Sequence, residues 1–360
     1  MTISSDPGLE ALVAQVQDAA ARRAALRIEG GDTKAFYGNP ADGECLSTLG
    51  LRGISDYAPT ELVVTARAGT PLSEVEAALA ERGQHLAFEP PRYAAGGTVG
   101  GMVAAGLSGP ARAASGAVRD HVLGASLLSG RGEILSFGGQ VMKNVAGYDV
   151  SRLLAGSLGT LGVILEVSLR TVPQPVESLT LAFEMDESAA LERINRWGGQ
   201  PLPITANAWL DGRLLVRLAG ASAAVRSSAA LLGGEAIAAH AAPWEALRDH
   251  RHAWFGSARA AVAQGATLWR LSVKSTAPAL GLASGGLAEW GGAQRWWFGH
   301  ADAAVVRDLA RAAGGHATRF LGPRNGIAAF APLSAPAARI QRQLMAAFDP
   351  HGIFNRGRLH

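Results

Sequence analysis

The chain has 360 residues, of which 48% are hydrophobic and 18% are charged, and its formal net charge is +3. This composition excludes a disordered chain and predicts a globular protein of about two domains. Because no basic block is interleaved with aromatic residues, the charge pattern does not favour nucleic acid as a partner.

Cys45 is the only cysteine, which excludes disulfides within the chain, an iron–sulfur cluster and a Cys-rich zinc site built from this chain alone. We therefore expect no metal site and a reducing compartment. The first residues lack a basic region followed by an apolar core, so no signal peptide is expected. The uncharged stretch 93–111 contains six glycines, which favours a soluble, cytoplasmic protein over a transmembrane one.

The first half of the chain alternates between helical and extended patterns. Apolar spacing predicts, in chain order, a helix over 9–20, strands over 26–28 and 61–68, a helix from residue 70, a hairpin of 121–128 with 133–137, and a strand over 162–172. Pro71 is expected at the first helical position, with Leu72, Val75 and Leu79 facing inward.

The segment 172–175, Val-Pro-Gln-Pro, is a predicted domain boundary, because all eight tryptophans lie beyond it. The predicted units are a domain over 1–174, a smaller α+β domain over 175–335, and a helix and tail over 336–360. The second half is expected to contain strands with Trp209, Val216 and Leu218 and helices over 222–232, 303–313 and 340–348, with Ser222 as an N-cap.

Three glycine clusters, 30–34, 95–109 and 156–162, are the most informative feature of the sequence. Without a Cβ, glycine lets backbone N–H groups come within hydrogen-bonding distance of a bulky anion. The run 95–106 has so many glycines that neither a packed helix nor a packed strand is expected there. The three clusters predict one large phosphate-bearing cofactor that is held by several loops.

The common glycine-rich and catalytic motifs are absent. The chain has no G-x-G-x-x-G dinucleotide fingerprint, no P-loop with Gly-Lys before Ser or Thr, no G-x-S-x-G elbow and no H-E-x-x-H zinc motif. The three glycine clusters therefore predict a less common type of cofactor-binding site.

A series of short motifs resembles the vanillyl-alcohol-oxidase family of flavoproteins, which have a PCMH-type FAD-binding domain. In order, the motifs are Gly30–Thr33, Gly97–Gly101, Val118–Asp120, Val122–Gly124, Asn144–Asp149, Gly156–Ile164 and Asp349–Asn355. The resemblance implies an α+β fold with a two-subdomain FAD-binding domain, a smaller α+β cap domain and a C-terminal tail that returns to the FAD domain.

Within that family, the segments 142–149 and 314–320 are most similar to the smaller FAD-binding subunits of glycolate oxidases. This similarity implies oxidation of glycolate, a small 2-hydroxy acid, to glyoxylate, with a larger FAD-containing catalytic subunit and an iron–sulfur subunit as partners. Association with a membrane would then be peripheral and through those partners. Two alternatives stay open, namely a self-sufficient FAD-dependent 2-hydroxy-acid dehydrogenase and a flavin-bound structural subunit without turnover.

The resemblance also implies which residues bind FAD. They are Gly30, Gly31, Asp32, Thr33, Lys34, Gly97, Thr98, Val99, Gly100, Gly101, Gly106, Arg119, Asp120, Val122, Gly156, Gly159, Thr160, Gly162, Val163, Ile164, Asn355 and Arg358. For a single glycine pair an ordinary turn is the simpler interpretation, and Ile164 is equally typical of a core strand. Some relatives carry a histidine in the first loop that bonds flavin covalently. Asp32 and Thr33 follow the glycines here, so noncovalent FAD is expected.

No catalytic residue is assigned from the sequence. Gly299–Asp302 resembles only the beginning of the histidine-rich cap motif of the catalytic subunits, and we interpret it as a coincidence. His250, His252 and His316 are expected to be surface or capping histidines. Arg270, Arg295 and Arg319 could bind a carboxylate, but the chain contains many arginines and the signal is weak.

Overall fold

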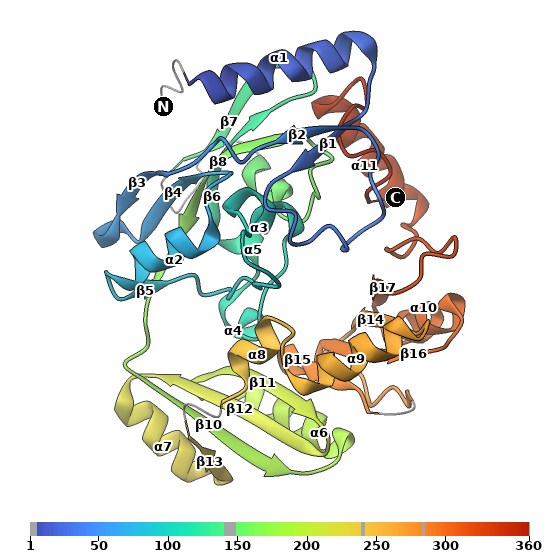
Figure 1. Ribbon diagram of the computed structural model, residues 1–360. Coiled ribbons are helices and arrows are strands. Elements are labelled where there is room, and N and C mark those ends of the chain that lie inside the picture. Colours follow the sequence, from blue (N-terminus) through green and yellow to red (C-terminus); the bar gives the residue numbers. More distant parts are fainter. Residues whose placement is uncertain (1–5, 140–148, 239–241, 283–284, 360) are drawn as a thin grey trace.

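The computed structural model describes residues 6–139, 149–238, 242–282 and 285–359. Two antiparallel sheets dominate it, one of five strands in the first half of the chain and one of eight strands in the second. Figure 1 shows the two sheets at opposite ends of the molecule, with short helices and loops between them. The expected α+β class is confirmed.

The five-stranded sheet has the order β3-β4-β8-β6-β7. Its strands are β3 (Ile54–Ala58), β4 (Val63–Arg67), β8 (Val163–Arg170), β6 (Val122–Leu128) and β7 (Ile134–Gly138). The predicted hairpin is confirmed, because β6 pairs with β7 from Gly124 opposite Gly138 to Leu128 opposite Ile134. Every residue of β6 is buried, so this strand lies at the centre of the first half.

A short helix, α3 (Val99–Ala105), lies within the glycine-rich run where no packed helix was expected, so that expectation is wrong. Gly100 explains the error. A Cβ at Gly100 would lie 2.7 Å from the Cβ of Ala68, so the glycine allows the helix to approach the end of β4. Close packing of the helix against the sheet compensates for the low helix propensity of glycine.

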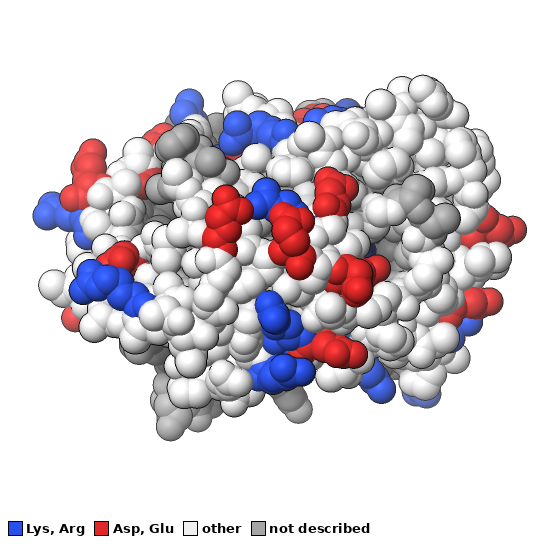
Figure 2. All heavy atoms as spheres, turned by 90° about the horizontal axis from the view of Figure 1, so that it is seen from below, with Lys and Arg blue, Asp and Glu red and all other residues white. Residues whose placement is uncertain are grey.

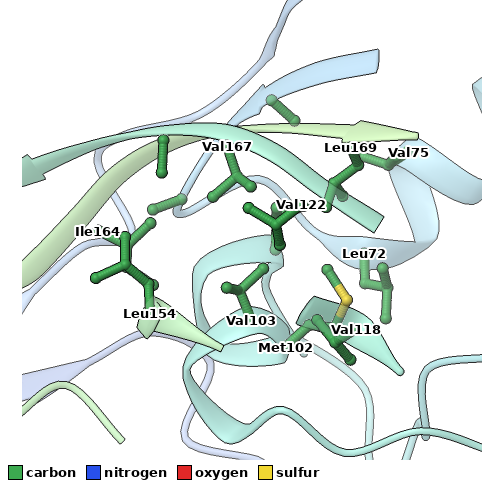
Figure 3. Packing of buried hydrophobic residues seen from close by; sticks show 14 of the residues in the cluster. Leu72, Val75, Met102, Val103, Val118, Val122, Leu154, Ile164, Val167 and Leu169 are labelled. Carbon is green, nitrogen blue, oxygen red and sulfur yellow. The ribbon is translucent and has the colours of Figure 1, made fainter. Parts of the chain in front are cut away.

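The core beneath the five-stranded sheet is aliphatic. Figure 3 shows Met102 and Val103 of α3 facing the strand residues Val122 and Val167, and all four belong to one buried cluster. The helix α2 (Leu72–Ala80) adds Leu72, Val75 and Leu79 to that cluster, as its spacing predicted.

Two helix starts differ from their predictions. Pro71 is the N-cap of α2 and not its first helical residue. Ser222 is the first residue of α7 (Ser222–Leu232), and Ala221 occupies the N-cap without a side-chain hydrogen bond. In contrast, α1 (Pro7–Arg22) is capped by Asp6, whose carboxylate accepts from the Gly8 N–H at 2.8 Å.

The C-terminal segment returns to the N-terminal one. The strands β1 (Leu26–Glu29) and β2 (Glu44–Ser47) form a small parallel pair, and Phe354 makes a parallel bridge with Leu26. The Asn355 N–H donates to the Leu26 carbonyl at 2.9 Å. Figure 1 accordingly shows the red C-terminal segment beside the blue β1 and β2. The helix α11 (Ala335–Phe348) begins five residues earlier than the predicted start at 340.

The eight-stranded sheet has the order β13-β10-β12-β11-β15-β16-β14-β17. Its strands are β10 (Glu177–Glu184), β11 (Ile204–Leu210), β12 (Arg213–Gly220), β13 (Glu235–Ile237), β14 (Thr267–Ser272), β15 (Leu287–Glu289), β16 (Gln294–Gly299) and β17 (His316–Leu321). Its helices, besides α7, are α6 (Glu187–Gly198), α8 (Trp244–Arg248), α9 (Ala253–Ala263) and α10 (Ala303–Ala312).

The two halves share buried contacts. A short strand pair joins β5 (Gln84–His85) to β9 (Val172–Pro173) immediately before β10, at the predicted boundary. The helix α4 (Arg112–Ser115) packs on β11 of the second half, and the next helix, α5 (Val118–His121), packs on β6 of the first half. One hydrophobic cluster contains side chains from both halves, including Tyr37 and Leu107 from the first and Trp296 and Phe320 from the second.

The surface has a mixed charge pattern where it can be seen. Figure 2 shows acidic and basic side chains interspersed over a largely uncharged face, without a continuous basic track on that face. Within the described part of the chain, no helix combines the length and apolar character needed to cross a bilayer.

Candidate FAD site

Three glycine-rich segments that are far apart in the sequence meet around one cavity of about 310 Å³. The turn after β1, the start of α3 and the segment 158–164 each supply part of the wall. The predicted residues that line it are Gly30, Gly31, Asp32, Thr33, Lys34, Thr98, Gly100, Gly101, Gly159, Gly162, Ile164, Asn355 and Arg358. The sequence therefore identified segments that the fold brings together.

The first two glycine loops touch through their backbones. A Cβ at Gly31 would lie 1.6 Å from the carbonyl oxygen of Gly96, and a Cβ at Gly30 would lie 2.5 Å from Oγ1 of Thr98. The Thr98 hydroxyl in turn accepts from the Gly101 N–H at 3.2 Å as the N-cap of α3. These glycines are needed because the two loops approach each other closely, and the wall at this contact is made of main chain.

The third loop is held by the returning tail. The side chain of Asn355 is buried and accepts from the Ile28 N–H at 2.8 Å, while its Nδ2 donates to the Leu158 carbonyl at 2.7 Å. A Cβ at Gly159, where φ is +75°, would lie 2.6 Å from that Nδ2. Asn355 thus connects β1 to the third loop, which is a positioning role.

The cavity carries an excess of positive charge. Four cationic side chains (Arg27, Lys34, Arg324 and Arg358) and two acidic ones (Glu29 and Asp32) line it. Two of these are paired with each other, since Arg27 lies 2.5 Å from Glu29. The Arg358 guanidinium donates to backbone carbonyls, including Ala35 O at 3.2 Å. Such a wall suits a ligand with a doubly charged anionic group.

Lys34 is the most perturbed of these cations. Burial lowers the pKa of its ammonium group to about 8. Its Nζ lies 5.9 Å from the centre of the Tyr93 ring, and no acidic side chain within the described residues forms an ion pair with it. An anion in the cavity would therefore restore much of the solvation that this ammonium has lost.

Neither a histidine nor a cysteine is present among the described residues that line the cavity. Cys45 is exposed, and its thiol donates to Oε2 of Glu29 at 3.1 Å. This hydrogen bond and burial raise the pKa of the thiol. The thiol is thus poorly suited to act as a nucleophile.

The remaining predicted residues do not line this cavity. They are Gly97, Val99, Gly106, Arg119, Asp120, Val122, Gly156, Thr160 and Val163. Gly106 and Gly156 lie back to back, because a Cβ at Gly106 would be 2.7 Å from the Gly156 nitrogen. Asp120 accepts from the Ala117 N–H at 2.8 Å at the start of α5. Direct contact of these residues with FAD stays a prediction.

Val99, Val122 and Val163 are buried core residues, and Thr160 donates to the Ser157 carbonyl at 2.8 Å. Arg119 is exposed at α5. Of the motif 142–149, residues 142–148 lie outside the described part, and Asp149 forms an ion pair with Arg152.

Sequence reasoning missed about half of the cavity wall. The additional lining residues are Arg27, Ile28, Glu29, Ala35, Pro40, Ala41, Thr48, Ala68, Ala104, Ala105, Leu158 and Arg324. Most of them are immediate neighbours of the predicted loops, so a wider window around each glycine cluster would have included them. Ala68 and Arg324 lie far from any glycine cluster of the first half in sequence and carry no such signal.

The histidine candidates differ from one another. Contrary to the prediction, the His250 ring is buried. It is stacked on the Phe255 ring with 3.8 Å between centroids, and burial lowers the pKa of the imidazole to about 3. His252 caps α9, as expected, by accepting from the Trp254 N–H at 3.2 Å. His316 is exposed. Asp302, in the fragment that resembles a cap motif, is the N-cap of α10.

The three candidate arginines have different hydrogen-bond partners. Arg295 and Arg319 are buried and donate to backbone carbonyls, Ala277 O at 3.1 Å and Ile327 O at 3.2 Å respectively. Arg270 instead donates to the hydroxyl of Tyr37 at 3.0 Å, across the two halves of the molecule.

Comparison with known proteins agrees with FAD as the ligand of the cavity. Residues 9–138 match the family described as "FAD binding domain". The glycolate oxidase subunit GlcE of Escherichia coli (strain K12) is 46% identical over 351 residues, which cover 98% of this chain and 97% of that protein. A D-2-hydroxyglutarate dehydrogenase of Xanthomonas citri pv. viticola is 33% identical over 186 residues, 50% of this chain and 39% of the relative.

A solved structure shares the fold. An alkyldihydroxyacetonephosphate synthase superposes with a TM-score of 0.66 at 16% identity, over 96% of this chain and 75% of that one. The cofactor is FAD, and the main-chain cradle and positive wall fit it. Because the likeness to GlcE extends over nearly the whole of both proteins, this chain belongs to the GlcE family of glycolate oxidase subunits.

Proposed function

We propose that this chain is the FAD-binding subunit of a glycolate oxidase complex, which oxidises glycolate to glyoxylate and passes electrons through flavin to partner subunits. The observation that carries the proposal is the 46% identity to GlcE over almost the full length of both chains. The cavity formed by the three glycine clusters supports it, because it offers backbone amides and positive charge in one place.

We also propose how the chain holds the cofactor. The loops at 30–33 and 98–101 would bind the pyrophosphate through main-chain N–H groups, and Lys34 would add a positive charge. Gly162 and Ile164 would border the rest of the molecule. The binding would be noncovalent, in keeping with a described wall that holds neither histidine nor cysteine. When bound, FAD supplies hydride and electron transfer, which side chains cannot perform.

The proposed partners are a larger FAD-containing catalytic subunit and an iron–sulfur subunit. With Cys45 as its only cysteine, this chain cannot ligate a cluster by itself. Electron transfer through iron–sulfur centres would therefore require another chain. We propose a cytoplasmic location, with any association with a membrane made through these partners.

Gly101 offers a sharp test of the cofactor site. It lines the cavity, and a Cβ there would meet only Oγ1 of Thr98, at 3.2 Å. Gly101→Leu should therefore fold but fill the cradle, with a loss of bound flavin of about tenfold or more, since overfilling a formed site costs about 1–3 kcal/mol. The matched control is Gly198→Leu at the end of α6, where a Cβ meets nothing within 4 Å.

The experiment uses the full chain, purified alone and after co-expression with the two partner subunits. Flavin is counted from its absorbance, and glycolate-dependent reduction of a dye is measured for each preparation. Bleaching by glycolate only in the complex supports the proposal. Bleaching of the chain alone would favour a self-sufficient dehydrogenase, and a flavin that never turns over in the complex would favour a structural subunit. A chain that binds no FAD contradicts all three hypotheses.

A further inference from the structure

The five-stranded sheet has a polar face on the side away from its aliphatic core. Along β8, Val167 belongs to that core, so alternation turns Glu166 and Ser168 to the other face. Ser126 of β6 lies opposite Glu166, and Ser136 of β7 lies opposite Ser126. Three neighbouring strands thus place one carboxyl group and three hydroxyl groups together on this face.

The next row of the same face lacks side chains. Gly124 of β6 lies between Gly138 of β7 and Ser168 of β8 in the strand register. Because the two glycines leave this part of the sheet uncovered, a cavity of about 280 Å³ is present beside Glu166. Ligand pockets typically have about 300–1,000 Å³, so this volume suits a small ligand. The cavity shares no lining residue with the cofactor cavity.

Glu166 is the only charged side chain among the described residues that line this second cavity. The residue is 8% exposed. Its Oε2 accepts from the hydroxyl of Ser55, whereas its Oε1 is buried and has no hydrogen-bond partner within the described part of the chain. A buried carboxylate oxygen without a donor is unfavourable, so a ligand that donates to Oε1 would be stabilised there.

The basic residue that faces Glu166 across the sheet is engaged elsewhere. Arg67 of β4 lies opposite Glu166 of β8 in the register. Its guanidinium forms an ion pair with the carboxylate of Asp6 at the start of α1. No ion pair is formed by Glu166 with any residue that the structure describes. The lining of the cavity therefore contributes an acidic group that it does not neutralise.

The hydroxyl groups add neutral acceptors to the carboxyl group. The hydroxyls of Ser126 and Ser136 are 3.2 Å apart, and that of Ser168 is 2.8 Å from the hydroxyl of Thr65. A hydroxyl that donates one hydrogen bond still has lone pairs to accept others. A primary ammonium group has three N–H donors and no acceptor, which matches this set, and its single charge matches one carboxylate.

A divalent metal ion fits the cavity less well. Calcium takes six to eight oxygen ligands, commonly with several carboxylates among them. Within the described ranges, no group of three or more His, Cys, Asp or Glu side chains could hold a metal ion. One carboxyl group in a cavity of about 280 Å³ instead suits an organic cation with a short carbon chain.

We propose that Glu166, with Ser126, Ser136 and Ser168, binds the ammonium group of a small free primary amine. The ammonium donates to Oε1 of Glu166 and to the serine hydroxyls, and its carbon chain lies over the glycine row. The site is on the face of the sheet opposite α3 and is separate from the FAD cavity. It adds a ligand to this chain that the oxidation of glycolate does not require.

The test is a calorimetric titration of the FAD-loaded full chain at low salt and pH 7. The probes are n-butylamine, which is protonated at this pH as a lysine side chain is, tetramethylammonium chloride and potassium chloride. Wild type should bind butylammonium with a dissociation constant on the order of 1 mM. Tetramethylammonium has the same charge but no N–H donor, so it should bind about tenfold more weakly or not at all.

Three variants locate the site. Glu166→Gln keeps the shape of the side chain and its contact with Ser55 but removes the charge, and it should weaken butylammonium binding about tenfold or more. Ser136→Ala removes one neutral acceptor at an exposed position of β7 and should weaken binding about twofold to tenfold. The matched control is Glu133→Gln, which removes an exposed carboxylate just before β7 and should bind as wild type does.

Flavin content and melting temperature are measured on the same samples. Loss of amine binding by Glu166→Gln with its flavin retained supports the proposal. The proposal fails if wild type binds no amine, if tetramethylammonium or potassium binds as tightly as butylammonium, or if Glu133→Gln weakens binding equally. If Glu166→Gln does not fold, Ser136→Ala decides by the same criterion. The same titration of the co-expressed complex tests the source of the ammonium group. A site that disappears there would belong to a cationic side chain of a partner subunit, which would also overturn the proposal.

Discussion

The cofactor cavity and a small pocket of about 10 Å³ between the two halves of the molecule are built on opposite principles. Part of the wall of the cofactor cavity is main chain, where Gly30 and Gly31 let two loops touch. The small pocket has walls of side chains, where Phe320 and His250 pack ring on ring. Main-chain walls depend on the absence of side chains, whereas the small pocket depends on their bulk. The same substitution should therefore have different consequences in the two places.

The largest effect should follow Gly31→Ala. The new Cβ would lie 1.6 Å from the Gly96 carbonyl oxygen, so the first two loops must separate. We expect FAD binding to be lost and the free energy of unfolding to fall by about 4 kcal/mol or more, because backbone must move. Urea denaturation and flavin absorbance measure the two quantities.

Gly50→Ala is the matched control for that change. Gly50 lies in the turn after β2, and a Cβ there would meet nothing within 4 Å. The variant should keep both stability and flavin. Equal behaviour of the two variants would show that glycine content in general, and not one close approach, governs the cradle.

The second prediction concerns Phe320, in the wall of the small pocket. Phe320 is 2% exposed and contacts five aromatic rings. Phe320→Ala should lower the free energy of unfolding by about 3–5 kcal/mol, as large cavities in cores do. FAD should still bind, since Phe320 does not line the cofactor cavity.

Phe348→Ala in α11 serves for comparison. Phe348 is half-buried, and its ring contacts Phe137 at 5.9 Å. Its loss should cost clearly less, about 1 kcal/mol for an edge-on aromatic pair. If Phe320→Ala releases FAD as completely as Gly31→Ala, the two cavities are one coupled unit and the comparison drawn above is wrong.

The contrast also explains what the sequence could predict. Glycine clusters are local, so Gly30, Gly100 and Gly159 were found without any structure, and periodicity located the hairpin at 121–137. The helix α3 was missed because propensity disfavours Gly100 in a helix, whereas contact with Ala68 requires it.

The pocket between the halves could not be predicted in this way. Its residues Tyr93, His250, Arg270 and Phe320 lie far apart in the chain and follow no common spacing. His250 was expected to be a surface or capping histidine, because nothing in its neighbourhood in the sequence reveals that Phe255 and Phe320 enclose its ring. Only tertiary packing brings such a set together, so a single sequence carries no pattern for it.

The smallest predicted effect involves Lys34, which lines the cofactor cavity and whose Nζ lies 5.9 Å from the ring centre of Tyr93 in the wall of the small pocket. Its pKa is lowered from 10.5 to about 8, so the unfolded chain binds more protons than the folded one between pH 8 and 10.5. The stability of the FAD-free protein should therefore rise with pH across this window. Above pH 8 the ammonium loses its charge, so affinity for FAD should fall over the same range.

Lys34→Met separates these two consequences. Without the buried ammonium, the FAD-free protein at pH 7 should gain about 1 kcal/mol of stability, since one pKa unit corresponds to about 1.4 kcal/mol and part of the shift is offset by solvent. Its affinity for FAD should fall and lose its dependence on pH between 8 and 10.5. Lys274→Met, at an exposed position, should change neither quantity. A Lys34→Met protein that binds FAD as tightly as wild type, with the same pH profile, would mean that the cradle holds its ligand through main chain alone.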